Sequence, residues 1–370
     1  MQNITHKDPD RSSRVVDSGF SVSGSVVDLF CGAGGLTHGF HLEGFNVAAG
    51  IDVDASCRFA YEHNNSAPFF EKDVASLTAS ELAGMFSPSG PKILVGCAPC
   101  QPFSSYNQKN EDPKYKLVEK FAELICDIEP DIVSMENVPR LLAFQGGKVF
   151  DRFLKMLEKH NYSVDKRVIY APDYGVAQSR SRLVLVASRL GPIRFIAPTH
   201  TPDSYSTVRE AIGDLPVLKA GEIDERDPMH RASRLSEINL KRIRASRPGG
   251  SWKDWDDKLV AKCHQNKSGD GYVSVYGRMT ADDPSPTITT QFFGFGNGRF
   301  GHPEQDRGLS LREGAILQSF PPKYAFAPPG EPIQFKKMGR MIGNAVPVLL
   351  AQAIARSVKI HLNEIASATP

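Results

Sequence analysis

The sequence predicts an α/β fold with an open, doubly wound sheet, and three observations carry this prediction. A β-rich run over 25–30 ends in the glycine-rich stretch CGAGG, and a helical pattern follows it. A second apolar run, over 47–51, ends at Asp52. A third run, over 93–95, stops at Gly96 and is followed four residues later by Cys100. Ligands bind beyond the carboxyl ends of such strands, so we expect a functional site at this edge of the sheet.

Length, charge and cysteine count set the class of protein. The 370 residues exceed a usual single-core domain, which predicts one large domain and a smaller one. A net charge of +2 does not by itself indicate a nucleic-acid partner, so any such argument rests on local charge. The six cysteines form no disulfide framework in a chain this long, and the lack of a long apolar run predicts a cytoplasmic protein without membrane insertion. The polar stretch 1–24 is predicted to be a flexible N-terminal tail.

The glycine-rich stretch predicts a loop whose backbone N–H groups approach a cofactor. The first two glycines of a dinucleotide fingerprint are present, but Thr37 stands where the third belongs, which disfavours a pyrophosphate. A tight turn without a ligand fits the same glycines. Asp52, some twenty residues past the loop, is placed either to bind ribose hydroxyls or to cap a helix. Asp73 is expected either to cap a helix over 76–85 or to face an adenine amino group.

The stretch ILVGCAPCQPFSS over 93–105 predicts a buried strand that presents Cys100 at its carboxyl end. An inert buried cysteine is the alternative for a thiol seen alone. Cys97 and Cys100 also form a CxxC pair, a pattern of redox sites and of half zinc sites. Zinc needs a second pair, and a redox pair usually opens a helix, whereas Pro102 and a polar loop follow here. We therefore predict no metal site and a nucleophilic role for Cys100.

Two further strands are predicted to bring polar side chains to the same edge of the sheet. The strand over 131–135 leads into Glu136, which is expected to act as an acid or hydrogen-bond partner of a substrate above the thiol, or to pair with a neighbouring arginine. Arg180 and Arg182 open the strand over 183–187. Their period-two spacing predicts that both point to one acceptor, such as a phosphate or a base carbonyl.

Six motifs now stand in a fixed order along the chain: DLFCGAGG, APCQPFS, MENVPR, QSRSR, SPTITT and IGNAVP. With this order and spacing, from Val26 to Ile360, the chain resembles the cytosine-5 DNA methyltransferase family. The resemblance implies a Rossmann-like catalytic domain that binds S-adenosyl-L-methionine and a smaller, loop-rich target-recognition domain. It further implies an enzyme that methylates carbon 5 of a flipped-out cytosine through a cysteine adduct at carbon 6.

The resemblance also assigns roles to individual positions. It makes Cys100 the nucleophile and Glu136 the group that bonds the cytosine ring nitrogen and amine. Arg180 and Arg182 would hold the base and its flanking phosphates. The implied cofactor-binding residues, with Asp52 on the ribose and Asp73 on the adenine, are Phe30, Cys31, Gly32, Ala33, Gly34, Gly35, Asp52, Val53, Asp73, Val74, Pro99, Leu117, Asn344 and Ala345.

Four neighbours of the nucleophile bear on this comparison. Ala98 stands where the family often has a proline, and we expect only a modest packing change from it. Gln101 and Ser104 are candidates for contacts with DNA. Cys97 receives no role, so Cys97→Ala is expected to retain most of the methylation that Cys100→Ala abolishes.

Prolines interrupt the strand–helix alternation over 191–338, which predicts that this segment is the second domain. Its basic stretch 231–247 contains a single acid and is predicted to bind DNA phosphates, the alternative being a solvated helix face. The candidate DNA contacts in this domain are Arg231, Arg234, Lys241, Arg242, Arg244, Arg278 and Arg299. Trp252 and Trp255 are expected to form a satellite core or to shape the same surface.

A helix over 343–362 should pack back on the first domain, so the catalytic domain is predicted to comprise 25–190 and 339–370. The sequence thus predicts a monomeric DNA (cytosine-5) methyltransferase of a restriction-modification or stand-alone type. It acts on double-stranded DNA, and any cognate restriction endonuclease acts separately. The alternatives are a tRNA cytosine-5 methyltransferase, a catalytically silent DNA-binding relative, and a nicotinamide-dependent oxidoreductase, which Thr37 disfavours.

Overall fold

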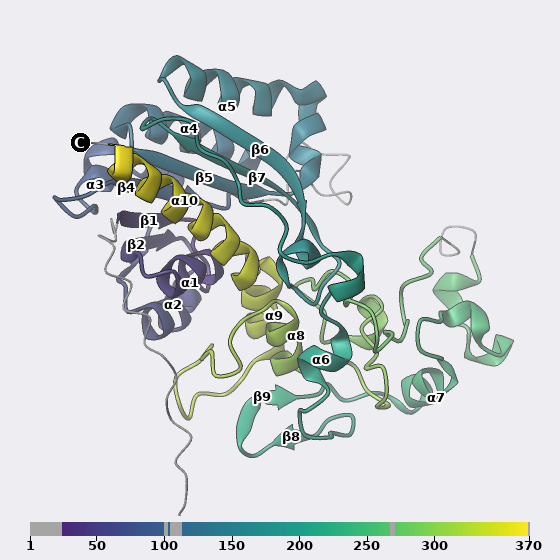
Figure 1. Ribbon diagram of the computed structural model, residues 1–370. Helices are drawn as coiled ribbons and strands as arrows, with labels where there is room; N and C mark the ends of the chain where they lie inside the picture. The colour runs from purple at the N-terminus through teal and green to yellow at the C-terminus, as the bar shows by residue number, and fades with distance from the viewer. Residues whose placement is uncertain (1–23, 100–102, 104–112, 267–270, 369–370) are drawn as a thin grey trace, which may run out of the picture.

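The computed structural model describes residues 24–99, 103, 113–266 and 271–368. Its centre is a seven-stranded sheet in the order β3-β2-β1-β4-β5-β7-β6 (Figure 1). The strands are β1 (Ser25–Leu29), β2 (Asn46–Asp52), β3 (Phe69–Glu71), β4 (Lys92–Gly96), β5 (Ile132–Asn137), β6 (Ser163–Tyr170) and β7 (Ser181–Ser188). The strands from β3 to β5 run parallel, whereas β7 is antiparallel to both β5 and β6. This mixed sheet confirms the predicted α/β class.

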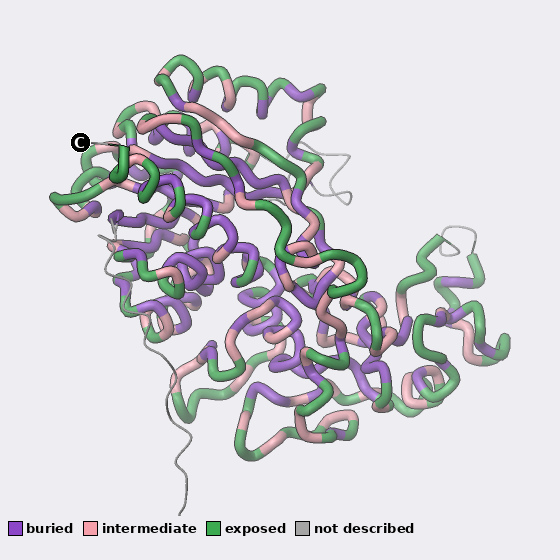
Figure 2. The backbone as a smooth tube through the Cα atoms, viewed as in Figure 1, coloured by how far each residue is buried: buried purple, intermediate pink, exposed green. Residues whose placement is uncertain are grey.

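Helices cover both faces of the sheet. One face carries α1 (Gly35–Leu42), α2 (Arg58–Asn65) and α10 (Val348–Ala368), and the other carries α3 (Ala79–Ala83), α4 (Lys116–Ile128) and α5 (Lys148–Lys159). Successive strand residues alternate between the two cores, so that Val26 packs on the first face and Val27 on the second. Figure 2 shows buried backbone in these layers and also around α8 (Leu311–Leu317) and α9 (Phe335–Asn344). The strands therefore read as continuous apolar runs because both of their faces are covered.

The C-terminal helix returns to the start of the fold, as the sequence predicts (Figure 1). A Cβ added at Gly39 of α1 would lie 2.4 Å from the Cβ of Ala351 in α10, so only glycine permits this close approach. Arg356 of α10 donates from Nε to Glu43 Oε1 at 2.8 Å, just beyond α1. The stretch Phe335–Ala368 has the length and mean hydropathy, 1.3, of a membrane span, but 72% of its most apolar window is buried inside the molecule. We therefore assign it to the core.

Two expected helices differ from the observed ones. In place of one helix over 76–85, a turn over Val74–Ser76 precedes the short helix α3, which begins after Thr78 with a capping box to Glu81. The motif expected to start the last helix instead separates two helices. α9 (Phe335–Asn344) ends in it, and α10 begins after Pro347.

The segment between β7 and α9 consists mostly of turns. Its regular elements are α6 (Val208–Ile212), the hairpin of β8 (Ile223–Asp224) and β9 (Asp227–Arg231), α7 (Glu237–Ala245) and α8 (Leu311–Leu317). Trp252 and Trp255 pack with Ile243 and Phe295 in a small separate cluster, which confirms the satellite-core interpretation of the two tryptophans. The predicted domain boundaries near 190 and 338 stay predictions.

Candidate active site

The loop between β1 and α1 has an unusual backbone. Phe30, Gly32 and Gly34 have φ angles of 62°, 51° and 90°, in the left-handed region that glycine enters without steric cost. A Cβ added at Gly34 would lie 2.5 Å from Asn65 Nδ2 and 3.0 Å from the Tyr324 hydroxyl. Glycine is thus required at position 34, and the loop turns its backbone toward the space in front of β1 and β2.

Asp52 closes β2 and holds this loop. Its Oδ2 accepts a hydrogen bond from the Gly32 N–H at 2.9 Å, and its Oδ1 accepts one from the Asp54 N–H at 2.8 Å. Burial raises the pKa of Asp52, while these backbone donors oppose the shift. The Asp52 carboxylate therefore holds the glycine loop in place. It also borders the open space in front of that loop.

That space is a pocket of about 450 Å³. Predicted cofactor residues that line it are Phe30, Cys31, Gly32, Ala33, Gly35, Asp52, Val53, Pro99, Asn344 and Ala345. The lining residues that the sequence analysis did not single out are Leu36, Asp54, Cys57, Cys97, Ala98, Lys114, Arg340, Met341 and Val346. Segments from both ends of the chain thus meet around one cavity, with a volume typical of small-molecule sites.

Arg340 is a charged lining residue that no sequence pattern predicts. It lies in α9, a helix that was not predicted, and its Nη2 pairs with Asp54 Oδ2 at 2.7 Å. This ion pair joins α9 to the end of β2 across the mouth of the pocket. No local motif marks Arg340, because its position follows from the packing of α9 against a distant part of the chain.

Four predicted cofactor residues do not line the pocket: Gly34, Asp73, Val74 and Leu117. Asp73 is exposed and accepts a hydrogen bond from the Ala75 N–H at 2.9 Å, so the capping interpretation is the one that the structure supports. Val74 is buried in the core that contains α3 and α4. The expected contact of Asp73 with adenine stays a prediction.

Glu136 lies beside the strand that leads to the cysteine motif, as predicted. Its side chain is almost fully buried, and its Oε1 lies 3.0 Å from Nε of Arg182. Its Oε2 accepts a hydrogen bond from Sγ of Cys97 at 2.9 Å. Cys97 also lines the pocket, so the Glu136 carboxyl lies directly behind a side chain of the pocket wall. The contact was not foreseen from the sequence, and it does not test the expected activity of Cys97→Ala.

The common acceptor expected for the two arginines, a phosphate or a base carbonyl, stays a prediction. In the described contacts Arg182 pairs with Glu136, whereas Arg180 is buried and donates from Nη1 to Ile288 O at 3.2 Å. Arg180 stands one residue before β7, which begins at Ser181. Its bond to Ile288 attaches the start of β7 to the SPTITT motif.

Cys100, the predicted nucleophile, lies outside the described residues, as do Gln101 and Ser104. The residues that lead to it, 93–99, are described. Ala98 is fully buried, and its carbonyl accepts a hydrogen bond from Asn137 Nδ2 at 3.0 Å. Asn137 is the residue after Glu136, so this bond joins the end of β5 to the segment after β4 that lines the pocket.

Two other cysteines line the pocket but have the character of inert thiols. Burial raises the pKa of Cys31 well above its usual value, and the carboxylates of Asp28 and Asp52 add to the shift. Burial also raises the pKa of Cys57. Neutral thiols are poor nucleophiles, so these two side chains act as apolar lining.

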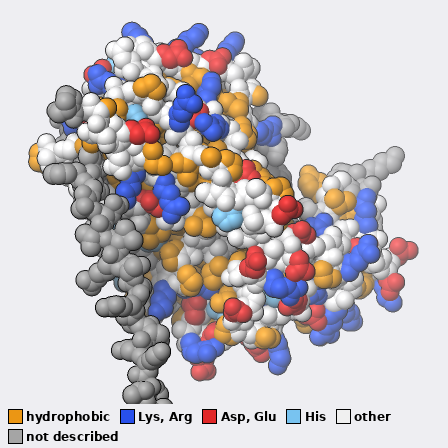
Figure 3. All heavy atoms as spheres, in the orientation of Figure 1, with side chains coloured by type: hydrophobic (Ala, Val, Ile, Leu, Met, Phe, Trp, Pro, Cys, Tyr) orange, Lys and Arg blue, Asp and Glu red, His pale blue; other side chains and the backbone are white. Residues whose placement is uncertain are grey.

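The predicted basic stretch divides into structural and exposed side chains. Arg242 donates from Nε to Leu259 O at 2.8 Å and lies over the rings of Trp255 and Tyr276, so it belongs to the small tryptophan cluster. Arg231 donates to Ile333 O at 2.9 Å. The exposed basic residues of the stretch are Arg234, Lys241, Arg244 and Arg247. Figure 3 shows Lys and Arg side chains interspersed with Asp and Glu on the lower part of the molecule.

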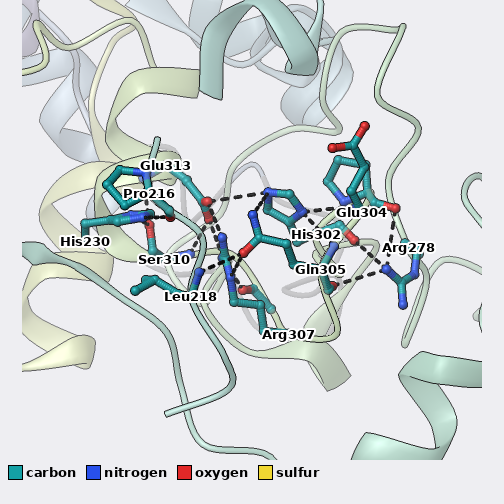
Figure 4. A network of polar contacts seen from close by, with 12 residues as sticks. Pro216, Leu218, His230, Arg278, His302, Glu304, Gln305, Arg307, Ser310 and Glu313 are labelled. Atoms are coloured by element: carbon teal, nitrogen blue, oxygen red, sulfur yellow. Dashed lines mark hydrogen bonds and ion pairs between the residues drawn. The ribbon is translucent and has the colours of Figure 1, made fainter. Parts of the chain in front are cut away.

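Arg278 is buried in a polar network and does not fit the predicted contact with DNA (Figure 4). Its guanidinium donates to the carbonyls of Ser246, Ile243, His302 and Gln305, and it pairs with Asp306 at 2.7 Å. Burial lowers the pKa of His302 to about 4, so its neutral ring accepts hydrogen bonds from the N–H groups of Glu304 and Gln305. Arg299, in contrast, is half-buried and donates to Gly250 O at 2.6 Å.

Comparison with known sequences gives matches along almost the whole chain. The family model for C-5 cytosine-specific DNA methylases matches residues 24–360. The type II methylase M.HgiDII of Herpetosiphon aurantiacus is 55% identical over 340 residues, which cover 92% of this chain and 96% of that relative. The type II methyltransferase M1.HphI of Haemophilus parahaemolyticus is 33% identical over 352 residues, which cover 93% and 89%.

Solved structures share the fold at lower sequence identity. A prophage-encoded protein from E. coli, described as a DNA modification methyltransferase, has a TM-score of 0.72 at 21% identity, covering 92% of this chain and all of that one. The methyltransferase EhMeth of Entamoeba histolytica has a TM-score of 0.61 at 16% identity, with 92% and 99% coverage. The overall fold of this chain is thus shared with these proteins.

Proposed function

The chain belongs to the C-5 cytosine-specific DNA methylase family, and we propose that it methylates carbon 5 of cytosine in duplex DNA with S-adenosylmethionine as methyl donor. Glu136 supports this proposal most directly. It is a buried carboxyl at the end of β5, held between Arg182 and Cys97 beside the pocket. Such a carboxyl is suited to bond the ring nitrogen and the amine of a cytosine.

The pocket between the glycine loop and α9 suits S-adenosylmethionine. When bound, this molecule supplies an electrophilic methyl group. Backbone groups of the loop that begins at Phe30 would contact its polar atoms, and Asp52 would accept hydrogen bonds from its ribose. Val53 lines the same pocket and is 69% exposed, so its side chain offers an apolar surface to adenine.

The chemistry requires a nucleophile because carbon 5 of cytosine is itself unreactive. Attack of the Cys100 thiolate on carbon 6 forms a carbon–sulfur bond and raises the electron density at carbon 5. Glu136 would hold a proton against the ring nitrogen, which lets the ring accept the electron pair. Arg182, paired with Glu136, would keep that side chain oriented. After methylation a base removes the carbon 5 proton, and the carbon–sulfur bond breaks.

Access to carbon 6 requires the cytosine to leave the helical stack, at a cost of roughly a few kcal/mol. The segment 191–338 would then read the target sequence, with the exposed Arg234, Lys241 and Arg244 on DNA phosphates. We propose that the protein is a cytoplasmic monomer and the modification component of a restriction-modification system, because the relatives above are type II methylases. Its endonuclease would act as a separate protein.

Bisulfite sequencing of DNA from cells that express the protein tests the proposal. The host should have no cytosine-5 methylation of its own. We expect protected cytosines at one short recurring sequence. A genome without protected cytosines, from cells that contain the soluble protein, would refute the proposed activity.

Two variants connect this activity to the proposed residues. Cys100→Ala should abolish protection, and Glu136→Gln should reduce it by two or more orders of magnitude, since it removes the ionisable group at the ring nitrogen. In vitro competition between duplex DNA and tRNA then separates the DNA enzyme from the tRNA alternative. Preferential methylation of tRNA would contradict the proposed substrate.

A further inference from the structure

We propose that Cys97, the first cysteine of the CAPC motif, is a positioning residue that holds the Glu136 carboxyl for catalysis. The inference rests on the role proposed above for Glu136. Its basis is the 2.9 Å contact in which Cys97 Sγ donates to Glu136 Oε2. Neither the redox nor the zinc interpretation of the motif accounts for this contact.

The register of the sheet brings the two side chains together. β4 and β5 are parallel, and their aligned pairs run from Ile93 and Ile132 to Gly96 and Met135. The next pair along is Cys97 and Glu136. Residues paired in this way on parallel strands project to the same face, so the thiol meets the carboxyl by strand geometry. The bond from Asn137 to the Ala98 carbonyl, at 3.0 Å, fixes the following pair as well.

The burial of Glu136 makes each of its contacts important. The residue is 2% exposed, and a buried carboxyl without partners is costly. Arg182 Nε lies 3.0 Å from Oε1, yet among the described residues Oε1 accepts no hydrogen bond. Oε2 is held by the thiol. Cys97 and Arg182 therefore hold the carboxyl from its two ends and leave Oε1 with the capacity to bond a substrate.

A metal role for Cys97 finds no support in the described part of the chain. No group of three or more His, Cys, Asp or Glu side chains there is arranged to hold a metal ion. The thiol of Cys97 instead meets an acceptor, and S–H is a small, weak donor that fits a buried site with little polar space.

Loss of the thiol should affect the chemical step more than binding. We expect Cys97→Ala to lower kcat about ten-fold, because the buried Glu136 carboxyl loses a hydrogen bond that holds it in place. The KM values for DNA and methyl donor should change less than two- to three-fold. Cys97→Ser restores a donor at the same position and should recover most of kcat. Rescue by serine separates positioning from simple packing, since serine fills less space than cysteine.

The test measures single-turnover methylation, the melting temperature, and exchange of the cytosine carbon 5 hydrogen with solvent without methyl donor. That exchange reports attack of the nucleophile at carbon 6 in isolation. The proteins are wild type, Cys97→Ala, Cys97→Ser, Glu136→Gln and Cys126→Ala. Cys126 is the matched control because it is a partly buried thiol on α4 whose Sγ lies 4.0 Å from Met156 O.

The outcomes are distinct. Slow methylation and slow exchange in Cys97→Ala, with recovery in Cys97→Ser and full activity in Cys126→Ala, would support the inference. Cys97→Ala as active as Cys126→Ala, or Cys97→Ser as slow as Cys97→Ala, would overturn it and leave the proposed function intact. Full activity of Glu136→Gln would overturn the proposed role of Glu136 itself.

Discussion

Asp28 is a buried carboxyl directly below the glycine loop. It is fully buried in β1, and its Oδ2 accepts a hydrogen bond from the Thr37 hydroxyl at 2.6 Å. Burial raises its pKa to about 7, although the Thr37 hydrogen bond opposes the shift. Thr37 is the residue that replaces the third glycine of a dinucleotide fingerprint. The Thr37 hydroxyl thus donates a hydrogen bond to Asp28 that a glycine at position 37 could not supply.

The raised pKa of Asp28 predicts a pH dependence of stability. Between pH 3.8 and about pH 7 the Asp28 carboxyl is protonated in the folded protein and ionised in the unfolded chain. The free energy of unfolding should therefore fall as the pH rises through this range. The slope is at most about 1.4 kcal/mol per pH unit. Asp28→Asn does not ionise and should flatten this part of the profile. Urea unfolding of both proteins across this range measures it, and parallel profiles would contradict the prediction.

Local sequence patterns identified individual site residues only where the chain is regular. The apolar run of β4 and the spacing to Glu136 placed two side chains at neighbouring strand ends. The contact of Arg180 with Ile288 O could not be predicted locally, because it joins residues 108 positions apart. The contact of Cys97 with Glu136 escaped prediction because it depends on the register between two strands, which is a long-range property.

α9 shows why one complete helix escaped prediction. Its sequence FKKMGRMIGN mixes lysines with two glycines, which weakens the helical signal. A Cβ added at Gly343 would lie 2.4 Å from the backbone of Thr289, so this glycine serves the packing of α9 on the SPTITT motif. Pro347 then fits the start of α10, because proline is tolerated just where a helix begins. The IGNAVP motif is therefore a break between two helices.

The connection between α8 and α9 is tied to the glycine loop through Tyr324. Its hydroxyl donates to the Ala33 carbonyl at 2.6 Å, and the side chain is 2% exposed. On its other side, Arg312 of α8 donates from Nη1 to the Tyr324 carbonyl at 3.0 Å. The conformation of the glycine loop, which lines the pocket, thus depends on a segment almost three hundred residues away in the sequence.

Tyr324→Phe should weaken binding of S-adenosylmethionine about five- to ten-fold, because the glycine loop loses the donor that holds Ala33. The matched control is Tyr162→Phe. Tyr162 is 4% exposed and donates to the Pro130 carbonyl at 2.6 Å, away from the pocket. Both variants should lose about 1 kcal/mol of stability. Calorimetric titration with the methyl donor would contradict the prediction if both variants bound it equally well.

The sheet and its two helical layers could be predicted because apolar runs, glycine turns and helical periodicity are local signals. The segment 191–338 could not be predicted in the same way. It is held by buried polar contacts such as Arg307 with Glu313, whose Nη2 and Oε1 lie 2.6 Å apart (Figure 4). Arg278 belongs to the same kind of network. A buried structural arginine and a DNA-binding arginine look alike in a sequence, and only the fold distinguishes them.

Binding of DNA by the intact protein should depend on salt through the exposed basic side chains. Lys241 is exposed on α7, so Lys241→Gln should reduce the slope of log affinity against log salt by about 1 if this lysine contacts a phosphate. Lys155 is exposed on α5, on the opposite part of the molecule, and Lys155→Gln is the matched control (Figure 1). Fluorescence anisotropy with a duplex at several salt concentrations measures both slopes. Equal slopes for the two variants would place the DNA elsewhere.

The most direct test uses a duplex in which 5-fluorocytosine replaces the target base in the sequence found by bisulfite mapping. Fluorine cannot leave as a proton does, so the enzyme should remain covalently attached once the methyl group has been transferred. We predict an adduct in the presence of S-adenosylmethionine, located by peptide mass spectrometry at Cys100 and missing in Cys100→Ala. An enzyme that methylates the normal duplex but yields no adduct, or an adduct at another residue, would contradict the mechanism.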